Sequence, residues 1–139
     1  MYLNNFNHLK ESKKMSTIQT EISAINAKFD QAFNAKNTAD IGQLYDTNAA
    51  VMPAPAGAPV IGVQAIQAFF AGLIEAGVID HKLTLTEAVE DGNLAYQLGN
   101  WAGAMVDAEG VRQTFSGNVH LVYRKQADGA WKAVTHIWN

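Results

Sequence analysis

The order of the periodic segments constrains the fold of this chain more than any other sequence feature. Between Ile18 and Lys36, apolar residues recur at three- and four-residue steps, which predicts an amphipathic helix. Ser16 and Gln19, at its start, have the form of a capping box. A short second helix is predicted from Thr38, a further helical pattern follows Gly62, and strand-type alternation fills the rest of the chain. Helices followed by hairpin-linked strands predict an α+β fold, with the helices packed on one face of an antiparallel sheet.

The predicted strands are long, and glycine interrupts them. Gly99 and Gly103 fall within the strand predicted over residues 94–106, and Gly117 falls within the strand predicted over residues 113–125. Glycine inside a strand often marks a bend or a bulge. We therefore predict a strongly curved antiparallel sheet that wraps around the long N-terminal helix as a cone-shaped barrel with a cavity inside.

Length and composition indicate one globular domain: the chain has 139 residues, of which 48% are hydrophobic and 17% charged. We assign residues 16–139 to this domain and residues 1–15 to a polar N-terminal tail. The net charge of -3 and the lack of a basic stripe argue against a nucleic-acid partner. No apolar run approaches the roughly 18 residues of a membrane span. We expect a cytoplasmic protein that needs no cofactor.

Two histidines on the last two predicted strands are the candidate catalytic residues. His136 and Trp138 share one face of the final strand, because successive side chains point to opposite faces. If His120 lies opposite His136, the pair could exchange protons with a ligand, and Asn118 opposite Trp138 could orient that ligand. In the alternative, one histidine is a hydrogen-bonded core residue and the other lies at a subunit interface. His81, which begins a strand after a helix, is expected to be exposed.

The hairpin loop between these strands decides which arrangement holds. A three-residue loop over residues 127–129, with Gly129 in the left-handed region, places His120 directly opposite His136. A two-residue loop places Leu121 opposite His136 and sends His120 to the other face of the sheet. We favour the three-residue loop. Two imidazoles without a third ligand at recognisable spacing do not predict a metal site.

Aromatic and apolar side chains complete the predicted ligand site. Tyr96 and Trp101 lie on opposite faces of their strand by parity, so one is expected to line the cavity and the other to cover a dimer interface. Tyr45 follows the short second helix and could point its hydroxyl group into the cone. Met52 and Pro53 are predicted to form an apolar rim, since methionine adapts to irregular ligand shapes.

Three segments together resemble the SnoaL-like, ketosteroid-isomerase-like superfamily, which has the nuclear-transport-factor-like cone fold. They cover residues 33–55, 61–70 and 128–139, and the resemblance extends from Thr17 to Asn139. It implies a small-molecule cavity and a homodimer joined through the outer face of the sheet. The short, uncharacterised domains of this superfamily are the most similar subgroup, and they commonly carry aspartate at the position of His136.

The catalytic groups of the ketosteroid isomerases do not carry over to this chain. Phe29 stands in place of their helix tyrosine, and residues 51–55 lack their proton-shuttling aspartate. Asn118, Val119 or His120 stands where their protonated aspartate lies. That reaction needs a base, a hydroxyl donor and a neutral acid in one pocket. True ketosteroid isomerisation is therefore not expected.

The sequence thus predicts a small-molecule pocket protein. The catalytic hypothesis is a cofactor-independent isomerase, dehydratase or cyclase that acts by acid–base chemistry on a small hydrophobic compound, and dehydratases of the superfamily with paired histidines offer the nearest analogy. The alternative is a non-catalytic ligand-binding or dimerisation module of the same fold.

Overall fold

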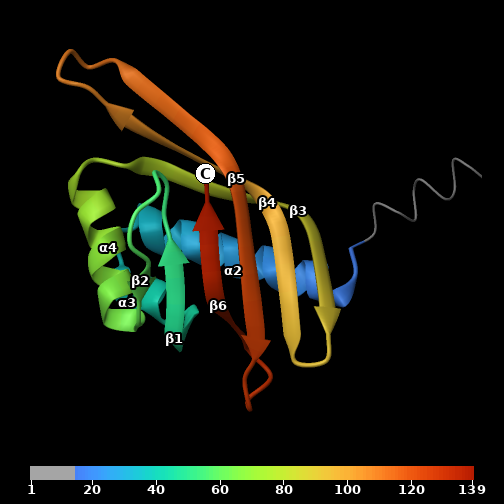
Figure 1. The fold of residues 1–139 in the computed structure, drawn as a ribbon. Helices are drawn as coiled ribbons and strands as arrows, with labels where there is room; N and C mark the ends of the chain where they lie inside the picture. The colour runs from blue at the N-terminus through green and yellow to red at the C-terminus, as the bar shows by residue number, and fades with distance from the viewer. Residues whose placement is uncertain (1–14) are drawn as a thin grey trace, which may run out of the picture.

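The fold is built around α2 (Thr17–Asn34), the helix that the N-terminal periodicity predicts (Figure 1). The computed structural model describes residues 15–139, so the predicted tail lies outside the described residues except for Met15. The other elements are, in chain order, α3 (Thr38–Gly42), β1 (Tyr45–Met52), β2 (Val60–Ile61), α4 (Val63–Glu75), β3 (Ile79–Asp91), β4 (Leu94–Val106), β5 (Arg112–Lys125) and β6 (Trp131–Trp138).

The predicted capping box starts α2. The Ser16 side chain accepts a hydrogen bond from the backbone N–H of Gln19, and the Gln19 side chain accepts one from the backbone N–H of Ser16. These bonds satisfy two of the N–H groups that a helix start leaves free. At the end of α4, Gly77 has the positive φ of 104° expected for the residue that follows a helix.

The strands form one six-stranded curved sheet that does not close, in the order β2-β1-β6-β5-β4-β3. Its pairs are antiparallel except for β1 and β6, which run parallel. The chain returns to β1 only after it has built the rest of the sheet, so this pair joins strands that are far apart in the sequence (Figure 1). The predicted α+β fold with a curved sheet around a long helix is confirmed, with one parallel pair in place of purely antiparallel pairing.

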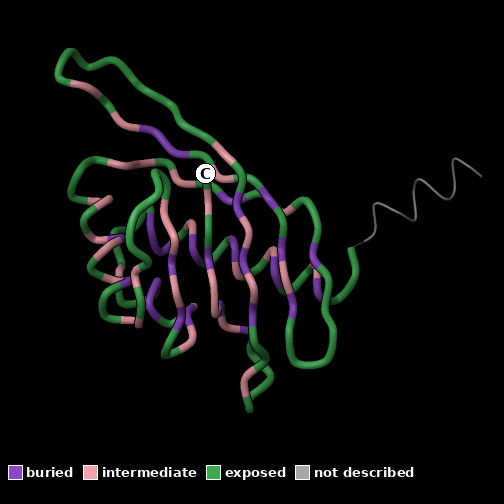
Figure 2. Tube along the Cα trace, viewed as in Figure 1, coloured by how far each residue is buried: buried purple, intermediate pink, exposed green. Residues whose placement is uncertain are grey.

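Irregular pairing accompanies the curvature of the sheet. The register between β3 and β4 shifts twice, once between Ile79 and Lys82 and once between Leu85 and Glu87. Gly99 pairs with Leu85 at the second shift, beside the carbonyl group of Thr84, where a side chain would collide with the backbone. Beyond this region β4 and β5 bend away from the body of the domain as a long, mostly exposed arm (Figures 1 and 2).

The core lies between α2 and the concave face of the sheet (Figure 2). A polar network crosses it: Asn26 of α2 and Gln97 of β4 exchange two hydrogen bonds through their amide groups, and Gln97 also donates to the Tyr123 hydroxyl group. All three side chains are buried. Buried polar groups are retained at low cost only when they are paired, so this network fixes how α2 sits on the sheet.

Within residues 15–139, no helix combines the length and the apolar composition that crossing a bilayer requires.

Candidate functional site

The β5–β6 hairpin has the predicted loop but not the predicted register at the histidines. Gln126 donates its backbone N–H to Ala130, and Gly129 has a φ of 86°, as the three-residue loop requires. Further along, Tyr123 pairs with Ala133, but the next pair is Val122 with Thr135, so β6 contains one extra residue there. This bulge shifts the register by one position.

The bulge separates the two predicted catalytic histidines. Leu121 pairs with His136, and His120 pairs with Ile137, so the predicted His120–His136 pair is wrong. A one-residue slip moves a side chain to the other face of the sheet. His120 therefore lies on the outer face, where its ring packs 5.9 Å from that of Tyr96.

Asn118 and Tyr96 share this outer face with His120. The prediction that Asn118 faces the inner cavity is wrong, whereas Tyr96 and Trp101 lie on opposite faces of β4, as strand parity predicts, and Trp101 is the one that lines the cavity. Trp138 pairs with Val119 rather than with Asn118. Leu98 and Ile137 flank His120 on the outer face and are 41% and 43% exposed. The predicted homodimer through this face stays a prediction.

A cavity of about 150 Å³ lies on the inner face of the sheet, at the end of α2 nearest α4. Its walls include Trp101 and Trp138, as predicted, together with His136. Met52 and Pro53 are not among its lining residues, although Ala54 of the same loop is. The other lining residues are Phe33, Phe69, Phe70, Leu73, Val78, His81, Leu83 and Phe115. The cavity is therefore an aromatic pocket with two imidazole groups in its wall.

His81 lines the cavity, and Asp30 of α2 binds its ring from outside the cavity lining. Its Nδ1 atom lies 2.8 Å from Oδ1 of Asp30, and the two side chains are 12% and 20% exposed, so the prediction of an exposed His81 is wrong. The Asp30 carboxylate also accepts the backbone N–H of Leu83, at 3.1 and 3.0 Å. A carboxylate fixed in this way holds the proton on Nδ1 and leaves Nε2 free as a base.

Local backbone geometry aims His81 at this site. Asp80, the preceding residue, has a φ of 56°. A positive φ of this size is uncommon for residues other than glycine. It lies in the first register shift of β3, and such bulges often re-aim a side chain beside a functional site. Asn34 then clamps the backbone of His81 with two hydrogen bonds of 2.8 and 3.0 Å.

Two sequence signals would have found this dyad. Strand parity places His81 on the same face as Leu83, which is buried. On the helix, Asn26, Asp30 and Asn34 recur at four-residue steps and form a polar row along one face. Each member of the row bonds to β3 or β4. Polar side chains on a helix face that packs against a sheet need hydrogen-bond partners on that sheet.

His136 also lines the cavity, and Tyr45, the first residue of β1, holds its ring. The Tyr45 hydroxyl group lies 2.7 Å from Nδ1 of His136. Burial lowers the pKa of His136 to about 3, and repulsion from the nearby His81 imidazole adds to the shift. Burial also raises the pKa of Tyr45 well above its ordinary value. Both groups are therefore neutral near pH 7. Nδ1 of His136 is the one hydrogen-bond partner of the buried Tyr45 hydroxyl group among the described residues, so the phenol O–H donates a hydrogen bond to Nδ1.

The tautomer of His136 follows from this hydrogen bond. When Nδ1 accepts, the ring proton is on Nε2. Within residues 15–139, every fully buried side-chain nitrogen or oxygen atom has a hydrogen-bond partner. Nε2 of His136 has no protein partner, so this atom reaches the cavity as an N–H donor. His81 and His136 thus offer a base and a hydrogen-bond donor to one space.

No group of three histidine, cysteine or carboxylate side chains within the described part of the chain is arranged to hold a metal ion.

The last residue of the chain holds one wall of the cavity in place. The Trp101 indole Nε1 donates to the backbone oxygen of Asn139 at 3.0 Å. The Asn139 side chain accepts the backbone N–H of Asn118, and the Asn139 N–H bonds to the Asn118 carbonyl group. Gly117 lies beneath this contact, where a Cβ atom would overlap the Asn139 backbone and come within 2.8 Å of Trp101 Nε1.

We expect Gly117→Ala to displace both Asn139 and the Trp101 indole. Forced packing of this kind typically costs about 1–3 kcal/mol of unfolding free energy. Urea titration would measure that loss. Gly110→Ala in the distant β4–β5 turn is an unsuitable control variant, because Gly110 has a positive φ that alanine adopts only with strain. Gly72→Ala on α4 is the better control, since its added Cβ meets no atom within 4 Å. Equal stability of the Gly117→Ala variant and the wild type would contradict this account.

Fold and cavity define the class: a cone-shaped domain in which a curved sheet and a long helix enclose a pocket. The chain belongs to the SnoaL-like domain family, whose model matches residues 26–134. The predicted superfamily is therefore confirmed. No curated protein matches the chain significantly.

Solved structures agree on the fold. A ketosteroid isomerase-like protein from Erwinia carotovora atroseptica superposes with a TM-score of 0.75 at 19% identity, over 89% of this chain and 96% of that one. A nuclear transport factor 2-like superfamily protein from Salmonella enterica serovar Typhimurium has a TM-score of 0.74 at 17% identity, over 88% of this chain and 90% of that one. An NTF2-like protein with a cystatin-like fold from Novosphingobium aromaticivorans has a TM-score of 0.75 at 16% identity, over 98% of this chain and 87% of that one. At these identities the likeness concerns the fold alone.

Proposed function

We propose that this protein is a cofactor-independent enzyme that removes a proton from carbon in a small, mostly apolar compound. The observation that carries the proposal is the His81–Asp30 dyad in an aromatic cavity that also receives the free N–H of His136. An imidazole oriented by a carboxylate is a common general base. The reaction class is isomerase or lyase, as the sequence predicts, but the base is His81 in place of His120.

In the proposed step, Nε2 of His81 takes a proton from the carbon next to a carbonyl group. The electron pair of the broken C–H bond forms a C=C bond, and the carbonyl oxygen takes the negative charge. Nε2–H of His136 donates a hydrogen bond to that oxygen. A neutral imidazole suits this task because its own proton stays in place while the charge develops.

The intermediate can then follow two routes. In a substrate with a C=C bond beside the carbon that loses its proton, the enolate is a dienolate, and return of the proton from His81 to the far carbon of that dienolate completes an isomerisation. Departure of a leaving group from the neighbouring carbon, with its electron pair, completes an elimination, and His81 then protonates that leaving group. Both routes return His81 to its neutral form without an external reagent.

The cavity limits the size of the substrate. An apolar cavity of about 150 Å³ accommodates a molecule the size of benzene. Its walls carry the rings of Phe33, Phe70 and Trp138, which suit a flat or cyclic compound. The ligand is thus a single-ring compound with one hydrogen-bond-accepting oxygen.

Deuterium exchange tests proton abstraction without knowledge of the natural substrate. We expect the wild-type protein to accelerate deuterium incorporation beside the carbonyl group of cyclohexanone or acetophenone in heavy water, as followed by NMR. A non-catalytic binding module would bind these ketones, with shifts of protein resonances, but would not accelerate exchange above the buffer rate. That second outcome would replace the enzyme with the binding module as the function.

A further inference from the structure

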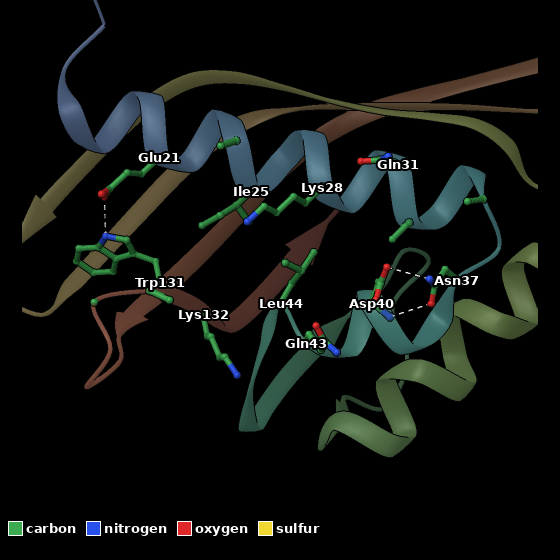
Figure 3. Close-up of a pocket in the computed structure, with 15 residues that line it drawn as sticks. Glu21, Ile25, Lys28, Gln31, Asn37, Asp40, Gln43, Leu44, Trp131 and Lys132 are labelled. Atoms are coloured by element: carbon green, nitrogen blue, oxygen red, sulfur yellow. Dashed lines mark hydrogen bonds between the residues drawn. The ribbon is translucent and has the colours of Figure 1, made fainter.

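The three tryptophans of the chain differ in what their indole N–H groups bind. Trp101 donates to the backbone oxygen of Asn139 at 3.0 Å. Trp131 donates to the Glu21 carboxylate at 2.9 Å, in a groove lined by residues of α2, α3 and the β5–β6 turn (Figure 3). The indole N–H of Trp138 has no hydrogen-bond acceptor within the part of the chain that the structure describes. Trp138 is therefore the one tryptophan that has a donor group to offer to a ligand.

The Trp138 side chain lies among residues of the cavity wall. It lines the cavity together with His136, two positions earlier on β6, and the ring centroids of the two residues are 4.8 Å apart. Phe69 and Phe70, which also line the cavity, have ring centroids 6.0 and 6.1 Å from that of Trp138. Every fully buried side-chain nitrogen of the described residues has a hydrogen-bond partner, so Nε1 of Trp138 is not fully buried. Its free N–H therefore borders an accessible space.

Strand pairing identifies this space as the cavity. Trp138 also borders a depression on the outer face of the sheet, and so does Val119. Val119 pairs with Trp138 between β5 and β6, and its side chain is buried in the core on the inner face. Because directly opposed residues point their side chains to the same face, the strand backbone accounts for the contact with the outer depression. The indole ring itself faces inward.

We propose that the Trp138 indole N–H is a second hydrogen-bond donor to the substrate oxygen and completes the oxyanion site that His136 begins. This inference rests on the proposed function, because the oxygen is the one that takes the negative charge when His81 removes the proton. An oxyanion accepts two or more hydrogen bonds, and Nε2–H of His136 supplies one of them. Two nitrogen donors on one oxygen lie roughly 4.5–5 Å apart. The 4.8 Å between the two rings is compatible with that spacing.

The two donors favour the charged state of the ligand over its neutral state. His136 and Trp138 project from one face of one strand, two positions apart, so the backbone of β6 fixes their spacing. Both N–H groups are neutral and keep their protons while charge develops on the oxygen. Hydrogen bonds to an ionised acceptor are roughly twice as strong as those between neutral groups. The ligand that fits this pair of donors is a flat single ring whose oxygen carries a negative charge.

Pentafluorophenolate and pentafluorobenzene test the inference by binding alone. They share one flat ring, and only the first carries an oxyanion at neutral pH. In ¹⁵N-labelled protein we expect the phenolate to move the indole proton of Trp138 downfield by about 1 ppm, because a charge-assisted hydrogen bond forms. Pentafluorobenzene should move it far less. The indole signal of Trp131, which stays bonded to Glu21 outside the cavity, should not move with either ligand.

Two results of this titration would overturn the inference. One is a Trp138 indole shift that is the same with both ligands. The other is a phenolate that binds no more tightly than pentafluorobenzene, because a site with two donors favours the oxyanion. Loss of the signal in the Trp138→Phe variant assigns it to this residue.

The rate of deuterium exchange tests the same donor during the reaction. Trp138→Phe keeps an aromatic ring in the wall but removes the N–H. We expect exchange in cyclohexanone to slow about a hundredfold to a thousandfold, the usual loss for one oxyanion donor. Affinity for the ketone should stay near that of the wild type, because this hydrogen bond gains its strength only as charge develops. Trp131→Phe removes the same kind of group outside the cavity and should exchange at the wild-type rate.

Replacing Trp138 with 3-benzothienylalanine separates loss of the N–H from a change in ring size. This amino acid keeps the bicyclic ring but has sulfur in place of the N–H group, so it should lose as much rate as Trp138→Phe. A benzothienylalanine protein that exchanges at the wild-type rate would overturn the inference. If the wild-type protein itself does not accelerate exchange, the proposed function fails, and the indole shifts still decide whether Trp138 binds the oxyanion.

Discussion

Replacing Asp30 with asparagine is expected to slow deuterium exchange in bound ketones by about a hundredfold to ten-thousandfold, the usual range for loss of a general base. With the amide oxygen in the place of Oδ2, where it makes the shorter bond to the N–H of Leu83, the amide nitrogen takes the place of Oδ1 and faces Nδ1 of His81. An amide N–H needs an acceptor there. The ring proton then moves to Nε2, and His81 has no free base at the cavity.

This tautomer change distinguishes Asp30 as a positioning residue from a purely structural one. Affinity for the ketone should stay near that of the wild type, while the exchange rate falls. His81→Gln, which removes the base itself, should lose at least as much rate as Asp30→Asn. Asp46→Asn is a matched control, since Asp46 bonds to Gln126 on another part of the sheet. An Asp30→Asn variant that exchanges at the wild-type rate would exclude His81 as the base.

Acid is expected to destabilise the domain through His136. Its pKa is about 3 in the folded protein, against an ordinary value near 6.5 in the unfolded chain. Between these two values the unfolded chain binds a proton that the folded chain does not, so the free energy of unfolding falls as the pH falls. Linkage gives a loss of about 2 kcal/mol at pH 5 and of the order of 4–5 kcal/mol near pH 3.

This loss is a large share of the total stability of a small domain, which is typically about 5–15 kcal/mol. Urea titrations from pH 7 to pH 4 would measure it. In the Tyr45→Phe/His136→Phe variant, both partners of the buried hydrogen bond are replaced together, so no polar group is left unpaired. We expect a flatter pH dependence for this variant. If the variant and the wild type lose stability equally between pH 6.5 and pH 4, His136 is not the group responsible.

His136 and His120 show which features of the site can be predicted from the sequence. His136 and Trp138 are predicted correctly on the inner face because strand parity is a local property. His120 is misplaced because the bulge in β6 inserts one residue, and parity beyond a bulge is reversed. Nothing in the residues from Ala133 to Thr135 marks that insertion. The hairpin loop itself is predicted correctly, since Gly129 carries its own conformational signal.

The sequence by itself determined the helix with its capping box, the turn at Gly77, the long bent strands and membership of the cone-fold superfamily. These features depend on periodicity and on residues with special backbone freedom, which act over a few positions. Only the tertiary structure decided which polar groups meet. Asp30 and His81 are 51 positions apart, and Tyr45 and His136 are 91 apart. Their contacts depend on how α2 and β1 sit against the rest of the sheet. Packing of the whole core sets that arrangement, so it cannot be predicted from any single segment of the sequence.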